Sequence, residues 1–208
     1  MTSNGDFKMT KIKICGLTRE CDIEAVNKEE PDYIGFVFAK SRRKVTPEQA
    51  GVLQRILRPT ITPVGVFVNE SPEIILSLVN KGIIEVIQLH GSEDERYIES
   101  LKLQTNKPII KAISVKRKGD VRKWNNTSAD YLLFDYKGGG TGQVFDWSLI
   151  GATSKSFFLA GGLKPENITD AVKKIKPFAV DVSSGVETEG LKDPEKIKEF
   201  IKRVRTGE

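Results

Sequence analysis

Hydrophobic and polar positions alternate along the chain in a pattern that predicts strands and helices in turn. A first strand is predicted over Lys11–Cys15, where Lys and Ile alternate, and this spacing indicates a strand with one buried face. The later strands are mostly continuous apolar runs, which are typical of parallel strands buried on both faces. These runs cover residues 32–38, 63–68, 83–89, 108–113, 131–135, 156–160 and 178–182.

Helix-start signals follow most of these strands. A capping residue followed by proline stands at Thr46, Ser71 and Asp193. Proline suits the first helical turn because an N–H at that position would have no hydrogen-bond partner within the helix. Helices are predicted over residues 18–28, from residues 46, 71, 92, 165 and 193, more weakly over 119–125, and briefly near Trp147. The last helix is amphipathic, with an apolar face of Ile197, Phe200, Ile201 and Val204.

Eight strand–helix units therefore fill the 208 residues. Each takes about 26 residues, close to the lower size limit of an eight-stranded α/β barrel. Apolar strands joined by crossover helices are parallel. We predict an α/β fold, a single-domain (βα)8 TIM barrel over residues 11–208, with a short polar tail at residues 1–10. A doubly wound open sheet is the alternative, but it fits five or six units better than eight.

Composition excludes several classes of protein. The chain is 38% hydrophobic and 29% charged, as globular proteins are, and no apolar run approaches the ~18 residues of a membrane span. The two cysteines, Cys15 and Cys21, suit a reducing compartment, so we expect a cytoplasmic protein. One histidine and two cysteines argue against a zinc site. The net charge of +5 is spread among acids without aromatic interleaving, which argues against a nucleic-acid partner.

In such a barrel the functional site lies where strands end and the next loops begin. Reading each predicted strand end gives one candidate set of side chains. From the first strand to the last, the set is Cys15, residues 41–43, Asn69, residues 88–91, Asp135, residues 161–162 and residues 181–185.

Two of these loops have the composition of a phosphate site. Gly161 and Gly162 follow the seventh strand, and Ser183, Ser184 and Gly185 follow the eighth. Barrels often bind phosphate at these loops, because glycine lets backbone N–H groups approach the anion and serine adds donors. Glycine and serine also suit ordinary turns, and that reading stays open.

An acid and a base are both present among the strand ends. Asp135 ends a very apolar strand, where partial burial favours the neutral carboxyl that a general acid needs, although a strand-end Asp can equally cap a turn. Cys15 acts as a base only as a thiolate, which nearby cations would favour; otherwise it is an inert core thiol.

The remaining candidates have two readings each. Arg42 and Arg43 can hold a carboxylate through paired hydrogen bonds, or form a solvated basic loop. His90 either takes part in the chemistry of the site or is a packed residue of the barrel rim. The glycine run at residues 138–142 suits a mobile flap or simply a flexible loop.

Eight motifs in chain order resemble those of one family. They are residues 13–18 (KICGLT), 35–38 with 41–43 (GFVF, SRR), 64–69 (VGVFVN), 88–91 (QLHG), 133–135 (LFD), 139–142 with 145–147 (GGTG, FDW), 160–163 with 165–167 (AGGL, PEN) and 179–187 (AVDVSSGVE). Together they resemble phosphoribosylanthranilate isomerases, from about Lys11 to the final helix. No position that the family uses for catalysis departs from its pattern.

The resemblance implies an Amadori rearrangement in tryptophan biosynthesis. N-(5-phosphoribosyl)anthranilate would become 1-(2-carboxyphenylamino)-1-deoxyribulose 5-phosphate, with Asp135 as the general acid and Cys15 as the general base. Arg43 matches the residue that binds the anthranilate carboxylate, whereas Arg42 stands in a more variable place.

The resemblance also completes the predicted site. Gln88, His90 and Asp181 join Arg43 as substrate-binding candidates, and the loops with Gly161, Gly162, Ser183, Ser184 and Gly185 would hold the phosphate. No metal or organic cofactor is implied. The expected partner is a small-molecule substrate, with no nucleic acid and no membrane, and the protein is expected to be a monomer or a homodimer.

Other readings stay open at this point. Indole-glycerol-phosphate synthase, a related barrel, would need a lysine at a strand end, and the sugar isomerase of histidine synthesis would need an acid in place of Cys15. A phosphate-binding barrel that has lost its chemistry is the non-enzyme alternative. Cys15 and Asp135 argue against it.

Overall fold

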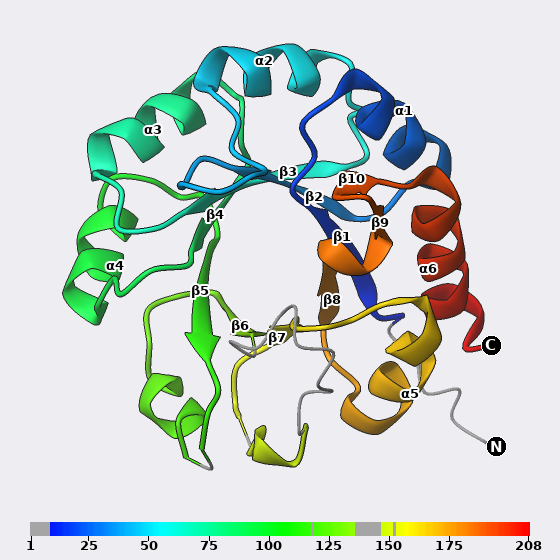
Figure 1. Ribbon diagram of the computed structural model, residues 1–208. Coiled ribbons are helices and arrows are strands. Elements are labelled where there is room, and N and C mark those ends of the chain that lie inside the picture. Colours follow the sequence, from blue (N-terminus) through cyan, green and yellow to red (C-terminus); the bar gives the residue numbers. More distant parts are fainter. Residues whose placement is uncertain (1–8, 118, 136–146, 152) are drawn as a thin grey trace, which may run out of the picture.

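Eight parallel strands form a closed barrel with helices around it (Figure 1). The computed structural model describes residues 9–117, 119–135, 147–151 and 153–208. The barrel strands are β1 (Lys11–Cys15), β2 (Tyr33–Val37), β3 (Thr62–Phe67), β4 (Val86–Leu89), β5 (Ile109–Ser114), β6 (Tyr131–Asp135), β7 (Phe157–Leu159) and β8 (Ala179–Val182). They pair in chain order, and β8 pairs with β1 to close the ring. The predicted TIM barrel is confirmed.

The outer helices match the predicted positions with two exceptions. The α-helices are α1 (Glu20–Glu29), α2 (Pro47–Arg55), α3 (Pro72–Asn80), α4 (Glu95–Lys102), α5 (Pro165–Ile175) and α6 (Pro194–Thr206). After β5 the structure has only the 3₁₀-helix η1 (Val121–Trp124), and before β7 only η2 (Trp147–Leu149) within the described residues. Both lie where a weaker helix over residues 119–125 and a short helix near Trp147 were predicted, but they are 3₁₀-helices and not α-helices.

Side-chain caps explain where several helices begin. Thr46 accepts a hydrogen bond from the N–H of Gln49 at the start of α2, and Asp193 accepts from Glu195 and Lys196 at the start of α6. The helix predicted from residue 92 begins at Glu95, because Asp94 is the residue whose side chain caps it.

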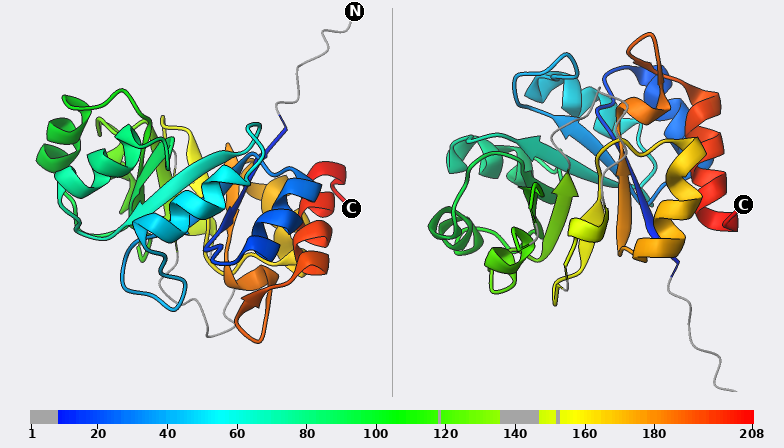
Figure 2. Two further views of the ribbon diagram at one scale, coloured as in Figure 1. Left: turned by 90° about the horizontal axis from the view of Figure 1, so that it is seen from above. Right: turned by 60° about the horizontal axis from the view of Figure 1, so that its bottom comes forward.

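The fourth strand is shorter than the predicted run of residues 83–89. The N–H of Ile83 bonds to the carbonyl of Leu78, so this residue closes the end of α3 and does not extend β4. After β8, a 3₁₀-helix η3 (Ser184–Val186) and a small hairpin of β9 (Glu187–Thr188) and β10 (Leu191–Lys192) precede α6, and none of these was predicted. The last helix, α6, packs against both α1 and α5, as two further views show (Figure 2).

The first strand departs from its prediction in an informative way. Ile12 and Ile14 belong to the apolar cluster between the barrel and the helices, so Lys13 and Cys15 face the barrel interior. Lys13 is 0% exposed. The strand is therefore buried on both faces, whereas the alternation of Lys and Ile predicted only one buried face. The predicted boundary of the tail at residue 10 stays a prediction, since residues 1–8 lie outside the described part.

An aromatic group fills the barrel interior near the strand starts. Phe158 is fully buried there, and its ring lies edge-on to Tyr33, Tyr131 and Phe178 at centroid distances of 5.5, 5.7 and 5.7 Å. Such contacts stabilise a core beyond the area that they bury. The barrel interior near the strand starts is thus filled by packed side chains.

We expect Phe158→Ala to lower the free energy of unfolding by about 3–5 kcal/mol, because it leaves a cavity among rings that cannot close in. Urea denaturation measures the change. Leu103→Ala is the control, since Leu103 is 89% exposed and should change stability by less than about 0.5 kcal/mol. Equal effects of the two substitutions would contradict the packing described here.

Candidate active site

The ends of the strands bring the predicted side chains to one rim of the barrel. Cys15 ends β1, Gln88 lies in β4 shortly before His90, and Asp135 ends β6. Because all eight strands are parallel, these ends share one side of the barrel.

Cys15 is held in a space that a glycine leaves open. Its side chain is 8% exposed, and a Cβ placed on Gly35 of the neighbouring strand would lie only 2.6 Å from the Cys15 sulfur. The hydroxyl of Ser183 donates to the carbonyl of Cys15 at 3.0 Å and ties the end of β1 to the loop after β8. Burial raises the pKa of the Cys15 thiol, and the ammonium groups of Lys13 and Lys192 offset only part of that rise. The expected cations are present, but burial outweighs them.

A buried ion pair lies beside the thiol. The Lys13 ammonium donates to Asp181 Oδ1 at 2.9 Å, and the two side chains are 0% and 9% exposed. Asp181 was predicted as a substrate-binding residue. Here one of its oxygens is engaged by Lys13, which the sequence reasoning did not select.

Asp135, His90 and Gln88 form a chain of polar contacts. His90 Nε2 lies 3.4 Å from Asp135 Oδ2, and His90 Nδ1 lies 2.9 Å from Gln88 Nε2. A hydrogen bond thus joins the Gln88 amide to the His90 ring, and the other ring nitrogen faces Asp135. Asp135 and His90 each remain 35% exposed, so both are open to a ligand. They border a cavity of about 380 Å³ that also includes Ala112 and Ser114.

A second buried ion pair fixes the loop that carries His90. Lys111 of β5 donates to Glu93 Oε2 at 2.7 Å and to the carbonyl of Gly91 at 2.8 Å. Glu93 also accepts from the N–H groups of Asn69 and Gly91. Burial would raise the pKa of Glu93, but Lys111 and the backbone N–H groups of Asn69 and Glu93 outweigh it and lower the pKa. These contacts therefore fix the residues that directly follow His90, at Gly91 and Glu93.

Arg43 meets an internal carboxylate at the rim. Its Nε and Nη2 donate to the two oxygens of Glu187 at 2.6 and 2.8 Å. Arg42 and Lys192 bind the same carboxylate at 2.5 and 2.6 Å. The side chain of Arg43 crosses above Gly16, where a Cβ would lie 2.4 Å from Arg43 Cδ. The predicted carboxylate-binding arginine is thus in place, with one edge of its guanidinium already occupied.

The two predicted phosphate loops lie against each other. A Cβ on Gly185 would lie 1.8 Å from the carbonyl oxygen of Leu163, so only glycine permits this approach. Gly161 and Gly162 both have positive φ angles, 87° and 68°, which glycine adopts without strain. In the described part of the chain, neither of their N–H groups donates to a protein acceptor. Ser184 opens the short 3₁₀-helix η3, which also contains Gly185.

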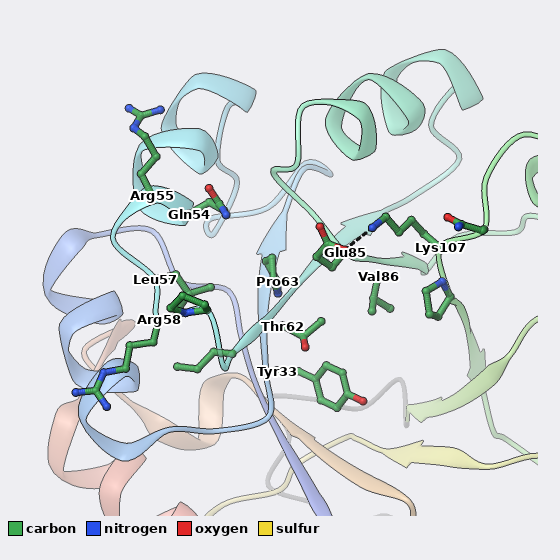
Figure 3. Close-up of a pocket in the computed structure, with 14 residues that line it drawn as sticks. Tyr33, Gln54, Arg55, Leu57, Arg58, Thr62, Pro63, Glu85, Val86 and Lys107 are labelled. Atoms are coloured by element: carbon green, nitrogen blue, oxygen red, sulfur yellow. Dashed lines mark hydrogen bonds and ion pairs between the residues drawn. The ribbon is translucent and has the colours of Figure 1, made fainter.

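The opposite end of the barrel has a large open hollow without this chemistry. It encloses about 850 Å³ and lies at the starts of β2 to β5, bordered by Tyr33, Thr62 and Val86. Glu85 and Lys107 pair across its edge, while Arg55 and Arg58 extend away from it (Figure 3). Its position at the strand starts, far along each strand from Cys15 and Asp135, sets it apart from the rim.

Most predicted site residues therefore gather at one rim, and several important ones were missed. The missed residues are Lys13, Glu93, Lys111, Glu187 and Lys192. A lysine inside a strand two residues before a candidate cysteine was the one available signal, because residues two apart share a face. The predicted flap at residues 138–142 lies outside the described residues. Among the residues that are described, no helix has the length and apolar character to cross a membrane.

Comparison with known proteins agrees with this geometry. Residues 12–203 match a family described as N-(5′-phosphoribosyl)anthranilate (PRA) isomerase. A protein of Endomicrobium trichonymphae named N-(5′-phosphoribosyl)anthranilate isomerase is 48% identical over 202 residues, covering 95% of this chain and 100% of that protein. The chain belongs to the N-(5′-phosphoribosyl)anthranilate isomerase family. It is therefore an isomerase of tryptophan biosynthesis, and the family expected from the motifs is confirmed.

Two solved structures of N-(5′-phosphoribosyl)anthranilate isomerases are informative neighbours. One is a complex with reduced 1-(o-carboxyphenylamino)-1-deoxyribulose 5-phosphate, with a TM-score of 0.84 and 38% identity, covering 95% of this chain and 99% of that one. The other describes monomers generated from the dimeric enzyme of Thermotoga maritima, with a TM-score of 0.83, 38% identity and the same coverage.

We expect Gly185→Ala to raise the KM for a phosphorylated substrate by about 10- to 100-fold, the range set by one lost hydrogen bond to a charged group. The added methyl forces apart the loops after β7 and β8, and steady-state kinetics measure the change. Gly151→Ala is the matched control, because a Cβ there meets nothing within 4 Å. An unchanged KM in a folded Gly185→Ala protein would refute a role for the loop contact.

Proposed function

We propose that this chain catalyses the Amadori rearrangement of N-(5-phosphoribosyl)anthranilate with Asp135 as the general acid and Cys15 as the general base. The observation that carries the assignment is their arrangement. A carboxyl group and a thiol end two strands of one rim, which also holds two glycine-rich loops and a pair of arginines. The family to which the chain belongs supports the choice of substrate.

Ring opening is the first step. Asp135 gives its proton to the ribose ring oxygen, the bond between that oxygen and C1′ breaks, and the lone pair of the anthranilate nitrogen forms a C1′=N double bond. The acid must hold a proton when the substrate arrives. His90 contacts Oδ2 of Asp135, and we assign the other carboxyl oxygen to the substrate.

Proton abstraction is the second step. The Cys15 thiolate takes the proton from C2′, the electrons of that C–H bond form a C1′=C2′ double bond, and the C=N electron pair returns to nitrogen. The resulting enolamine becomes the ketone when the C2′ hydroxyl loses its proton and C1′ gains one. No step in this sequence needs a metal or an organic cofactor, and that absence stays a prediction.

Polar groups around the two catalytic residues suit the rest of the substrate. Gln88 Oε1 is buried and has no hydrogen-bond partner among the described residues, so it is an acceptor available to a ribose hydroxyl. Lys13 binds Oδ1 of Asp181, and the other oxygen of this carboxylate is our candidate for a second ribose contact. We assign both residues to the sugar.

The two charged ends of the substrate have separate partners. Glu187 binds the Nε and Nη2 edge of Arg43, which leaves Nη1 for the anthranilate carboxylate and fixes the guanidinium before the substrate binds. The phosphate would lie between the N–H groups of Gly161 and Gly162 and those of Ser184 and Gly185, with the Ser183 and Ser184 hydroxyls nearby.

The setting of the enzyme follows from its chemistry. A free thiol as the base fits a reducing compartment such as the cytoplasm. The substrate is a small molecule, and neither nucleic acid nor membrane is required. We propose that the protein is a monomer or a homodimer, in keeping with the dimeric relative from Thermotoga maritima.

We expect Cys15→Ser and Asp135→Asn each to lower kcat by about 10²- to 10⁴-fold, because each removes one proton-transfer group. The fluorescence of the anthranilate substrate reports turnover directly. Cys21→Ser is the control, since Cys21 is exposed on α1. Near-normal turnover in both Cys15→Ser and Asp135→Asn would overturn the assigned roles.

We expect Arg43→Ala to raise KM, or to lower kcat if the carboxylate also positions the ring, by about 10- to 100-fold in kcat/KM through loss of a charge-assisted contact. Arg55→Ala, on the exposed side of α2, removes the same charge elsewhere. An unchanged kcat/KM in Arg43→Ala would contradict its role in binding the carboxylate.

A further inference from the structure

We propose that Lys13 is a positioning residue whose ammonium group, held by Asp181, stabilises the thiolate form of Cys15. This inference rests on the proposed role of Cys15 as the base, and it answers what makes a buried thiol able to act as one.

The geometry places the ammonium and the thiol in one compartment. Lys13 and Cys15 are two residues apart on β1, so both side chains face the barrel interior. Lys13 lies opposite Asp181 in the β1–β8 register, and its Nζ donates to Asp181 Oδ1 at 2.9 Å. Gly35 keeps the sulfur in this position, since any larger residue would collide with it.

Positive charges outnumber negative charges around Cys15 as long as its side chain is a neutral thiol. Lys13 faces it from β1, Asp181 from β8, Lys192 from β10 and Arg43 from the loop after β2. Glu187 neutralises part of this set by binding Arg43 and Lys192. Three cations therefore share two carboxylates. A thiolate at Cys15 supplies the missing negative charge, and in a poorly solvated interior such compensation is worth more than in water.

Lys13 is suited to this role because it stays charged. Burial alone would lower the pKa of Lys13, but the Asp181 carboxylate and the Cys15 side chain outweigh burial and raise it. For Cys15, burial raises the pKa and Lys13 is the strongest opposing influence. Lys13 is thus a permanent cation and not a base, and among the groups near Cys15 it does most to favour the anion.

Only Cys15 exchanges protons in this scheme. The resting thiol loses its proton to water, and the thiolate forms beside the Lys13 ammonium. Sulfur then takes the C2′ proton of the substrate and becomes a thiol again. Lys13 neither gives nor takes a proton at any stage, so its contribution is electrostatic.

The test measures the Cys15 thiolate in the free protein. Cys21→Ser serves as the background, so that Cys15 is the single cysteine, and the thiolate is followed against pH by its ultraviolet absorbance and by its rate of alkylation with iodoacetamide. We expect Lys13→Met to lower the thiolate fraction at neutral pH by at least about tenfold, one unit of pKa. In the Cys21→Ser background kcat should fall with it and recover as the pH rises.

A second variant should change the thiolate fraction of Cys15 in the opposite direction. Asp181→Asn removes a carboxylate that disfavours the anion, so the thiolate fraction should rise. Lys111→Met is the matched control: Lys111 is an equally buried ammonium in an ion pair with Glu93, but it does not contact Cys15. Its loss should lower stability and leave the thiol titration unchanged.

The outcomes separate this inference from the proposed function. An unchanged Cys15 titration in Lys13→Met, or a shift in the same direction in Asp181→Asn, overturns the role of Lys13. Normal turnover in Cys15→Ser instead overturns the role of Cys15 itself, whatever Lys13 does. Should Lys13→Met fail to fold, Lys13→Gln and Asp181→Asn carry the same test, because each changes one charge with little change in volume.

Discussion

The barrel closes where β1 meets β8, and a buried ion pair spans that seam. Lys13 and Asp181 are 168 residues apart in the chain, yet they lie opposite each other in the register that joins the first strand to the last. An ion pair in such a place is costly to break, about 3–5 kcal/mol when one partner is removed, because the other charge is left unpaired. The pair therefore favours one alignment of the two strands. In that alignment the Ser183 hydroxyl donates to the Cys15 carbonyl, so the end of β1 is joined to the loop after β8.

Charge in this site is arranged before any ligand binds. The pairs Lys13–Asp181 and Lys111–Glu93 lie beneath the rim, and Glu187 gathers Arg42, Arg43 and Lys192 at its edge. The anions are fewer than the cations around Cys15. A substrate with a carboxylate and a phosphate thus enters a field that already favours negative charge, and the fixed partners limit how far the cations move when it does.

The sequence predicted the barrel and the rim well because both rest on local signals. Apolar runs mark strands buried on two faces, and caps such as Thr46 and Asp193 mark helix starts. Strand ends then follow directly, which is why Cys15, Asp135 and the loops at Gly161 and Gly185 were found. The missing helix after β5 was harder, since residues 119–125 carry a helix signal too weak to decide between α and 3₁₀ geometry.

The electrostatic partners were not predictable in the same way. Alternating Lys and Ile is typical of a strand with one solvent-exposed face. No local sequence signal distinguishes such a strand from a barrel strand whose polar face points inward. Glu187 was missed because its partner Arg43 is 144 residues away. Long-range convergence of this kind depends on the closed topology, so it becomes visible only in three dimensions.

The contact between Gly35 and the sulfur of Cys15 has an evolutionary consequence. The two positions share a single volume, so position 35 cannot gain a side chain while the sulfur of Cys15 is in place. A lineage that keeps the thiol must keep glycine at position 35, and a side chain can enter there only after position 15 has given up its sulfur. Drift across this pair is therefore ordered, with the loss of the sulfur preceding the filling of the space beside it.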